Sequence, residues 1–252
     1  MLRKLPSPRR GFGRLFNAMA VAAALCASSA SQAGVLDFEA PVDAPFVFAG
    51  DVLKIGNYIV EGAGDTNAEN PALVGAIGGN DSCFGAQCPA NNATNYYSAV
   101  ADGYMFFGLA DGSDFKLASL DASFIGTGLL SYPSVAALLY LTAFDANGIV
   151  AEAYLNLAGP IGGSFNFANY DLSTFGDGAW FNTVRVASFA CDTLGNCDRT
   201  RNQANFAIDN IVTVDASEVP EPGSFALLGL GLLGLGAARR AASRNAARRN
   251  AA

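Results

Sequence analysis

The central part of the chain consists of strand-length apolar runs separated by turn residues, and this pattern limits the possible fold more than any other feature. Residues 138–146 and 149–157 flank the dipeptide Asn147-Gly148. That dipeptide predicts a hairpin with a type I′ turn, because both central positions of such a turn need a positive φ. In the second arm every other residue is apolar, which is typical of a strand with one buried face.

Further runs between residues 34 and 217 have the same character. Glycine, asparagine, aspartate and proline separate them, and no long amphipathic helix interrupts the series. Many short strands in one region of this length predict an all-β fold, an antiparallel β-sandwich of jelly-roll type. The predicted strands cover residues 35–38, 57–61, 104–109, 115–124, 164–169, 183–189 and 206–214.

The N-terminal region has the order of a secretory signal. Basic residues from Arg3 to Arg14 precede an apolar stretch at 15–27, and small residues follow up to Ala33. We therefore expect a signal-peptide helix over residues 1–33 that signal peptidase removes before Gly34. The apolar stretch is too short for a permanent anchor.

Charge and composition exclude several functions. Residues 34–218 contain 21 acidic and five basic side chains, a formal net charge of −16, which disfavours binding to nucleic acid or anionic lipid. The chain has no histidine, so the usual general base near neutral pH is missing. We assign no catalytic residue and expect no enzyme. A hydrolase that uses Asp and Glu stays as an alternative.

Removal of the signal peptide would leave four cysteines in two close pairs. An exported protein passes through an oxidising compartment, so we predict the disulfides Cys83–Cys88 and Cys191–Cys197. A four-cysteine zinc site and other pairings remain open at this point.

The C-terminal region changes character after Ser217. A stiff proline-containing linker, Val219-Pro220-Glu221-Pro222, leads into an apolar segment at 223–238. As a helix this segment would be about 24 Å long, short of the roughly 30 Å hydrocarbon core. It has no polar face to meet water. We predict a transmembrane helix that spans with local thinning or arginine snorkelling, followed by cytoplasmic arginines at Arg239 and Arg240.

This order of Pro-Glu-Pro, apolar helix and basic cluster resembles the PEP-CTERM sorting signal, also labelled an ice-binding protein C-terminal domain without implying ice binding. The resemblance covers residues 218–240, and a basic tail at 241–252 is longer than usual. It implies recognition by a membrane exosortase, cleavage near the motif, and transfer to the cell envelope or the extracellular polysaccharide matrix.

Residues 36–39 and 206–211 resemble the opening and closing strands of galactose-binding-like jelly rolls, the fold of many carbohydrate-binding modules. The second segment also partly resembles a Gln-Phe-x-x-Asp group of PEP-CTERM proteins, although two residues separate Gln203 from Phe206. The resemblance implies that the first and last strands are neighbours. It also implies a structural calcium held by Glu39 and Asp209, with Asp37 a weaker third ligand. Alternatively, Asp209 lies on an exposed strand face or starts a turn.

Exposed aromatic side chains could bind a glycan, because the C–H faces of sugars pack on aromatic rings. The candidates for this role are Tyr96, Tyr97, Tyr104, Trp180 and Phe181. Together these features predict an exported, non-catalytic protein of the envelope or matrix that associates with extracellular polysaccharide. A purely structural matrix protein without a small ligand is a further alternative.

Overall fold

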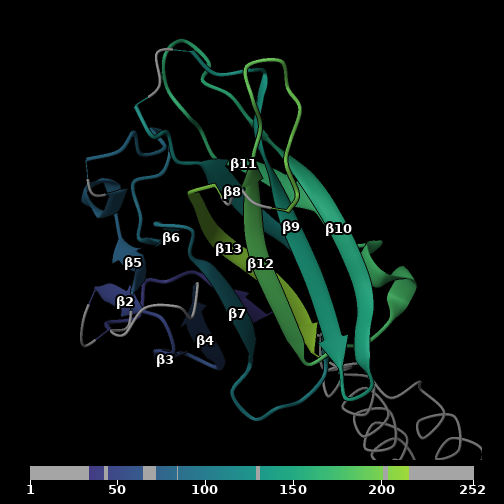
Figure 1. Cartoon of the computed structure of the whole chain (residues 1–252). Helices are drawn as coiled ribbons and strands as arrows, with labels where there is room; N and C mark the ends of the chain where they lie inside the picture. The colour runs from purple at the N-terminus through teal and green to yellow at the C-terminus, as the bar shows by residue number, and fades with distance from the viewer. Residues whose placement is uncertain are drawn as a thin grey trace, which may run out of the picture. The chain divides into compact units, whose positions relative to one another are not determined.

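Two antiparallel β-sheets form the fold of this computed structural model (Figure 1). Seven strands make one sheet in the order β11-β8-β13-β6-β5-β2, with β1 paired to β13, and six strands make the other in the order β10-β9-β12-β7-β4-β3. The prediction of an all-β antiparallel sandwich is confirmed. The seven-stranded sheet contains β1 (Gly34–Leu36), β2 (Phe46–Phe48), β5 (Leu73–Gly78), β6 (Tyr96–Ala99), β8 (Phe115–Phe124), β11 (Ala168–Asp171) and β13 (Phe206–Asp215). The six-stranded sheet contains β3 (Val52–Ile55), β4 (Tyr58–Ala63), β7 (Tyr104–Leu109), β9 (Val135–Asp145), β10 (Gly148–Ala158) and β12 (Thr183–Ala190).

The structure describes residues 34–42, 45–64, 72–83, 85–128, 131–200 and 204–215. They fall in one unit, Gln32–Ser217. The predicted signal peptide at 1–33, the C-terminal segment at 218–240 and the basic tail at 241–252 lie outside the described residues. Among the residues that are described, no helix is both long enough and apolar enough to cross a membrane.

Four short strands were not predicted from the sequence, namely β2, β3, β5 and β6. β5 illustrates the reason, because its glycine and alanine content gives little strand signal. Position 75 has no room for a side chain, because a Cβ there would lie 2.5 Å from the hydroxyl oxygen of Tyr97. The predicted run at 164–169 also forms a strand later than expected, as β11 at Ala168–Asp171.

The predicted hairpin is present as β9 and β10, but its turn differs from the expected type. Asp145 pairs with Gly148, so Ala146 and Asn147 are the central residues, and neither has a positive φ. The carboxylate of Asp145 accepts hydrogen bonds from the backbone N–H groups of Asn147, at 2.7 Å, and Gly148, at 3.0 Å. Gly148 alone takes the positive φ. The type I′ prediction was wrong because this aspartate caps a turn one residue earlier.

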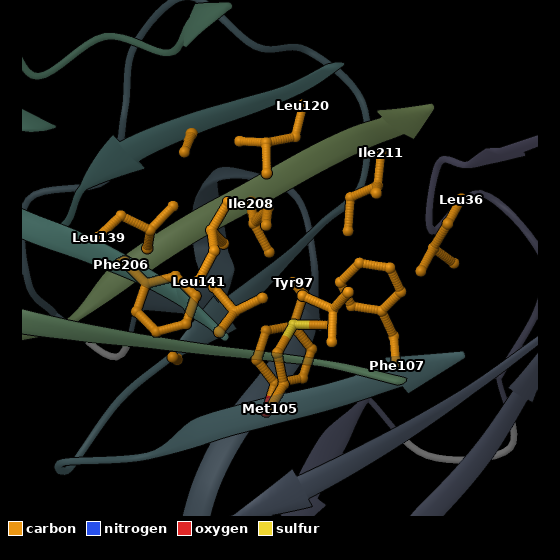
Figure 2. Packing of buried hydrophobic residues seen from close by; sticks show 14 of the residues in the cluster. Leu36, Tyr97, Met105, Phe107, Leu120, Leu139, Leu141, Phe206, Ile208 and Ile211 are labelled. Atoms are coloured by element: carbon orange, nitrogen blue, oxygen red, sulfur yellow. The ribbon is translucent and has the colours of Figure 1, made fainter. Parts of the chain in front are cut away.

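The core lies between the two sheets (Figure 2). Alternate residues of each strand point inward, as Leu139 and Leu141 do on β9, and meet residues such as Leu120 and Ile208 of the other sheet. All four are fully buried. Because the strand period is two, this inward set fixes which side chains face outward on every strand.

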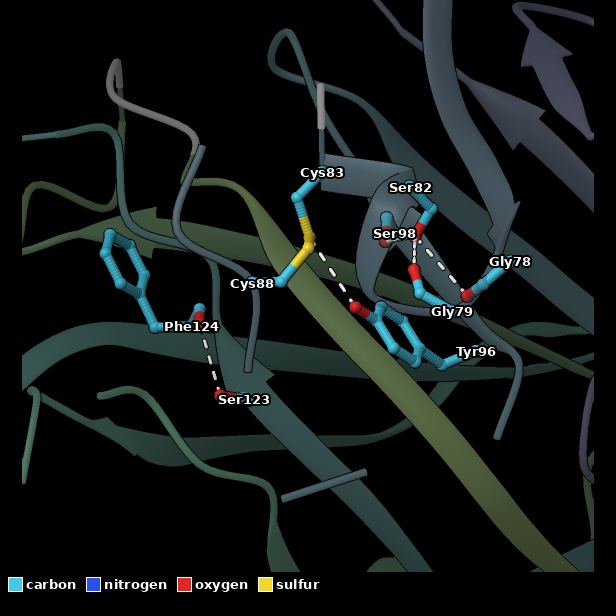
Figure 3. Close-up of a disulfide and its surroundings, with 9 residues drawn as sticks. All are labelled: Gly78, Gly79, Ser82, Cys83, Cys88, Tyr96, Ser98, Ser123 and Phe124. Carbon is cyan, nitrogen blue, oxygen red and sulfur yellow. Dashed lines mark hydrogen bonds between the residues drawn. A yellow bond between two sulfur atoms is a disulfide. The ribbon is translucent and has the colours of Figure 1, made fainter. Parts of the chain in front are cut away.

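Both predicted disulfides are present, as Cys83–Cys88 and Cys191–Cys197. Figure 3 shows the first of them beside Tyr96, whose hydroxyl oxygen is 3.6 Å from the sulfur of Cys83. Cys83 belongs to a small apolar cluster with Tyr96 and Ile125. The short 3-10 helix η1 (Asn80–Cys83) and the segment after it therefore cover part of the outer side of the seven-stranded sheet.

We expect Phe107→Ala, at a core position that is 1% exposed, to lower the free energy of unfolding by about 3–5 kcal/mol, because it leaves a cavity between the sheets. Chemical denaturation would measure the change. As a control we choose Ile149→Ala on β10, where the side chain is 59% exposed. This substitution should change the free energy of unfolding by less than about 0.5 kcal/mol. Equal effects of the two substitutions would contradict this account of the core.

Candidate functional site

Three of the aromatic side chains predicted to bind a glycan are buried, namely Phe181 and the two tyrosines of β6. Tyr96 and Tyr97 are both 0% exposed. They lie on β6, a central strand whose two faces are both covered, Tyr97 by the core and Tyr96 by the segment closed by the Cys83–Cys88 disulfide. Burial raises the pKa of the Tyr97 phenol far above its ordinary value. None of the three rings can meet a glycan, so this part of the prediction was wrong.

Trp180 and Tyr104, two further predicted aromatic residues, are partly exposed. Trp180 follows the 3-10 helix η2 (Phe175–Gly178), and the ammonium nitrogen of Lys116 lies 4.4 Å from the centroid of its ring. Lys116 belongs to β8 of the seven-stranded sheet. A role for Trp180 in ligand binding stays a prediction.

The two acids predicted to bind calcium contact the same segment from two sides. Glu39 accepts a hydrogen bond from the backbone N–H of Asn95 at 2.6 Å, and Asp209 accepts one from the side-chain amide of Asn92 at 2.8 Å. The pairing of β1 with β13 confirms that the first and last strands are neighbours. Asp209 is 1% exposed, so the alternative of an exposed strand position is wrong.

Asp209 is paired with a second acid across the sheet. Its register partner on β8 is Asp121, whose carboxylate accepts hydrogen bonds from the side-chain amides of Asn169, at 2.8 Å, and Asn210, at 3.0 Å. The backbone N–H of Asn210 donates to Asp209 at 2.8 Å from a bulge position with a φ of 48°. All these donors are neutral.

The surroundings of Asp209 disfavour its charge. Burial raises its pKa to about 6, and the neighbouring charge of Asp121 adds to this. The hydrogen bonds from Asn92, Asn210 and Thr94 act in the opposite direction without cancelling the effect of burial.

The residues around Glu39 and Asp209 fit a calcium ion only in part. Calcium takes six to eight oxygen ligands, and within the described ranges no three acidic, cysteine or histidine side chains gather closely enough to hold a metal. Asp37, the weaker third ligand, accepts a hydrogen bond from the backbone N–H of Glu39 at 3.2 Å. Backbone and amide oxygens would have to complete the site, and calcium stays a prediction.

The Asp121 and Asp209 pair also bears on the hydrolase alternative. Directly opposed residues of paired strands have Cβ atoms roughly 5 Å apart, and glycosidases need two carboxyl groups that face each other across a cleft open to substrate. Asp209 is buried, however, and donors of its own chain occupy both of its oxygens. Asp209 in this arrangement holds Asn92 and Thr94 in place, while Asp121 is only partly buried.

A different surface exposes aromatic and charged groups together. On the six-stranded sheet the residues that alternate with the core set point away from the core, and we call this surface the outer face. Paired residues of β10, β9, β12, β7 and β4 form rows that run across this face, perpendicular to the strands. The side chains that define it are Glu61, Tyr104, Phe106, Tyr140, Phe144, Glu152, Tyr154 and Arg185.

One end of the outer face carries a stacked tyrosine pair. Tyr140 and Tyr154 are register partners whose ring centroids are 4.6 Å apart at an interplanar angle of 13°. The guanidinium carbon of Arg199, from the loop after β12, lies 4.1 Å from the Tyr154 ring centroid. The Tyr140 hydroxyl donates a hydrogen bond to Glu152. The ring of the exposed Tyr154 therefore has both an aromatic and a cationic neighbour.

The middle of the outer face repeats this arrangement. The guanidinium carbon of Arg185 lies 4.6 Å from the centroid of the Tyr104 ring, and Phe106 packs on the same ring at 5.8 Å. The Nε atom of Arg185 is buried and has no hydrogen-bond partner. Arg185 thus packs its guanidinium against aromatic surface, a geometry that favours cation–π attraction.

A cleft of about 750 Å³ opens among the loops at one end of the sandwich. Tyr132, Asn196 and Asn205 line it, together with the acids Asp102, Asp192 and Asp198. Its described lining contains no basic residue. The cleft is therefore acidic, whereas the outer face carries both arginines and glutamates.

Comparison with known families identifies the C-terminal region. Residues 218–240 match the family model described as the PEP-CTERM protein-sorting motif. The chain carries a PEP-CTERM sorting signal. The signal confirms the expectation from the sequence and marks an exported protein that is processed at a membrane. The matched range includes Val219, Pro220, Glu221, Pro222, Arg239 and Arg240, none of which is among the described residues.

No curated protein sequence matches this PEP-CTERM protein significantly. Among solved structures it is similar to a family 11 carbohydrate-binding module of Clostridium thermocellum, at 12% identity and a TM-score of 0.30 over 69% of this chain and 97% of that one. It is also similar to the CBM22-1 xylan-binding domain of Paenibacillus barcinonensis, at 12% identity and a TM-score of 0.32 over 75% and 97%.

An arabinose-bound α-L-arabinofuranosidase matches at 12% identity and a TM-score of 0.35 over 73% of this chain. The PEP-CTERM protein spans about a quarter of that enzyme, 26% of its length. TM-scores this low carry no argument about ligand or activity, so the site has to be argued from its own residues.

Sequence reasoning missed most residues of both surfaces. Asn92 and Asp121 lie far from Asp209 in the sequence, and only the tertiary structure brings them to it. The outward positions on residues 149–157 were visible in the period-two pattern. The stacking of Arg185 on Tyr104 was not, because the two strands are far apart in the sequence.

The raised pKa of Asp209 leads to a prediction about pH. The pKa of Asp209 is about 6 in the folded protein and about 3.9 in the unfolded chain. The folded protein therefore binds this proton more tightly, and protonation of Asp209 stabilises the fold. The contribution of Asp209 is full below about pH 4 and is lost as the pH rises through about 6. It amounts to on the order of 3 kcal/mol. Chemical denaturation across this range, without divalent cations, should show this gain on acidification in the protein and its loss in Asp209→Asn.

Other acids titrate in the same range, so the comparison between variants carries the test. Asp121→Asn removes the neighbouring charge that raises the Asp209 pKa, and it should move the midpoint of the gain to lower pH. Identical pH profiles for the protein and Asp209→Asn would show that burial does not shift this carboxyl group.

Proposed function

We propose that this PEP-CTERM protein is a non-catalytic, polysaccharide-associated component of the cell envelope or extracellular matrix. Signal peptidase would remove residues 1–33, and a membrane exosortase would process the signal at 218–240. The apolar segment at 223–238 would anchor the chain transiently in the inner membrane. The observation that carries the binding function is the outer face, which presents tyrosine rings with guanidinium groups stacked on them.

The outer face suits an extended polymer. From β10 to β4 it crosses four strand spacings, about 19 Å at roughly 4.8 Å each. Its side chains stand on a sheet whose other face is packed in the core, so they are held in place before a ligand arrives. Such preorganisation reduces the entropy lost on binding. Tyrosine hydroxyls, carboxylates and guanidinium groups can then make hydrogen bonds with sugar hydroxyls.

We expect the full chain, solubilised in mild detergent, to bind at least one polysaccharide in a panel of neutral and acidic polymers. Tyr104→Ala should weaken this binding about tenfold, because it removes both a ring and the support of Arg185. Affinity electrophoresis through gels that contain each polymer would measure it.

Phe48→Ala serves as the matched control, since it removes an aromatic ring that is 42% exposed but lies on β2 of the seven-stranded sheet. It should leave binding unchanged. A loss for Phe48→Ala and not for Tyr104→Ala would place the binding surface on the seven-stranded sheet instead. No retention by any polymer would contradict the proposed function.

We also propose a structural calcium ion, for which Glu39 and Asp209 would supply carboxylate oxygens. The buried carboxylate of Asp209 has only neutral donors and the nearby Asp121 around it, so a cation there would relieve unfavourable charge. Calcium bound between these acids would join the first and last strands to the segment 92–95.

Calcium at pH 7 should therefore raise the melting temperature relative to the chelated protein, and Glu39→Gln should abolish the rise. Differential scanning calorimetry would measure both. Asp145→Asn, an exposed acid in the β9–β10 turn, is the control and should keep the calcium response. An unchanged melting temperature on chelation would refute the calcium proposal and leave the polysaccharide proposal standing.

A further inference from the structure

Positive charge is distributed unevenly over this acidic domain. Four basic side chains, Lys54, Lys116, Arg185 and Arg199, lie in the described ranges. Arg185 points outward from β12, Lys54 points outward from β3, and Arg199 lies over Tyr154 of β10. Three of the four are therefore on the outer face. Only Lys116 belongs to the other sheet.

The two arginines determine what the outer face offers to a ligand. Each guanidinium lies over a tyrosine ring, Arg185 on Tyr104 and Arg199 on Tyr154. These ring faces are therefore covered and are less available for stacking on a sugar. A guanidinium group that stacks through its plane keeps its N–H donors at its edge, where they can form a bidentate pair with a carboxylate.

The structure adds a further observation about Arg185. Its Nε atom is buried and lacks a hydrogen-bond partner, which leaves a donor without the compensation that buried polar groups normally have. The two acids in its row, Glu152 and Glu61, are register neighbours two strands away on either side. Glu152 accepts a hydrogen bond from Tyr140.

We infer that the polysaccharide bound by the outer face is acidic, and that its carboxylate groups pair with Arg185 and Arg199. The inference rests on the proposed function and specifies its ligand class. A uronic acid in every repeat would supply planar carboxylates along an extended chain. Two guanidinium groups, one on β12 and one on the loop that follows it, can then hold two carboxylates of one polymer.

The negative charge of the rest of the domain does not prevent this binding. At physiological ionic strength the Debye length is about 8 Å, so charges on the other sheet are screened and the groups in contact decide. Repulsion still acts against polymers of high charge density. Double-stranded DNA carries a charge every ~1.7 Å, whereas a uronan carries at most one per sugar. An acidic polysaccharide is therefore favoured over nucleic acid.

The test uses the full chain in mild detergent and two probes, polygalacturonate and the same polymer after chemical reduction of its carboxyl groups. The reduced polymer keeps the backbone and hydroxyl groups but has no charge. We expect binding to polygalacturonate to be at least about tenfold tighter, and to weaken when salt near 1 M shortens the Debye length to about 3 Å.

Arg185→Gln and Arg199→Gln should each weaken binding to polygalacturonate about tenfold, the effect of losing roughly one hydrogen bond between charged groups. Lys116→Gln removes one positive charge and one cation–π pair from the other sheet, and it should have less than about a twofold effect. Arg185→Lys keeps the positive charge but loses the planar arrangement of N–H donors. Its affinity should therefore lie between those of the unchanged protein and Arg185→Gln. Arg199 lies on an exposed loop, so its variant tests the inference even if Arg185→Gln unfolds.

The possible results separate the two proposals. Equal binding to native and reduced polymer, or equal loss for Lys116→Gln and Arg185→Gln, would overturn the acidic ligand while leaving polysaccharide binding intact. Equal, arginine-dependent binding to double-stranded DNA would also overturn it, because the outer face would then be a general polyanion site. Binding to none of the polysaccharides in the panel would refute the proposed function itself.

Discussion

The packing of two sheets through their apolar faces is the constraint on which the rest of the molecule depends. Each strand must give alternate residues to the shared core, as β9 gives Leu139 and Leu141. The residues between them are then obliged to face away from the core. Tyr140 reaches the outer face for this reason. A shift of one residue in register would exchange the two sets and destroy both the core and the surface.

Part of the outer side of the seven-stranded sheet is also covered, so side chains on both of its faces are buried there. The disulfide-closed segment after β5 lies over this side, and Tyr96 is buried beneath it. Close by, burial of Asp209 is compensated by neutral donors from Asn92, Thr94 and Asn210. The raised pKa follows from this incomplete compensation. This region joins the chain ends of the fold, since β1 and β13 pair there.

On the six-stranded sheet the outward side chains of Glu61, Glu152 and Tyr154 are exposed. On this side Arg185 packs on the ring of Tyr104, and Arg199 packs on the ring of Tyr154. A guanidinium group stacked through its plane keeps its N–H donors at its edge. The acids are spread over the domain, whereas three of the four basic side chains in the described ranges lie on one side of this sheet. Under our proposal this side is where an anionic chain approaches.

The sequence alone determined the features that depend on local pattern. These were the strand alternation, the position of the β9–β10 hairpin, both cysteine pairs and the sorting signal at 218–240. Tertiary structure alone decided that Tyr96 and Tyr97 are buried, and that Arg185 stacks on Tyr104. The physical reason is that periodicity reports the two faces of one strand. Burial and pairing depend on which strands and segments lie beside it, and register between distant parts of the chain sets those neighbours.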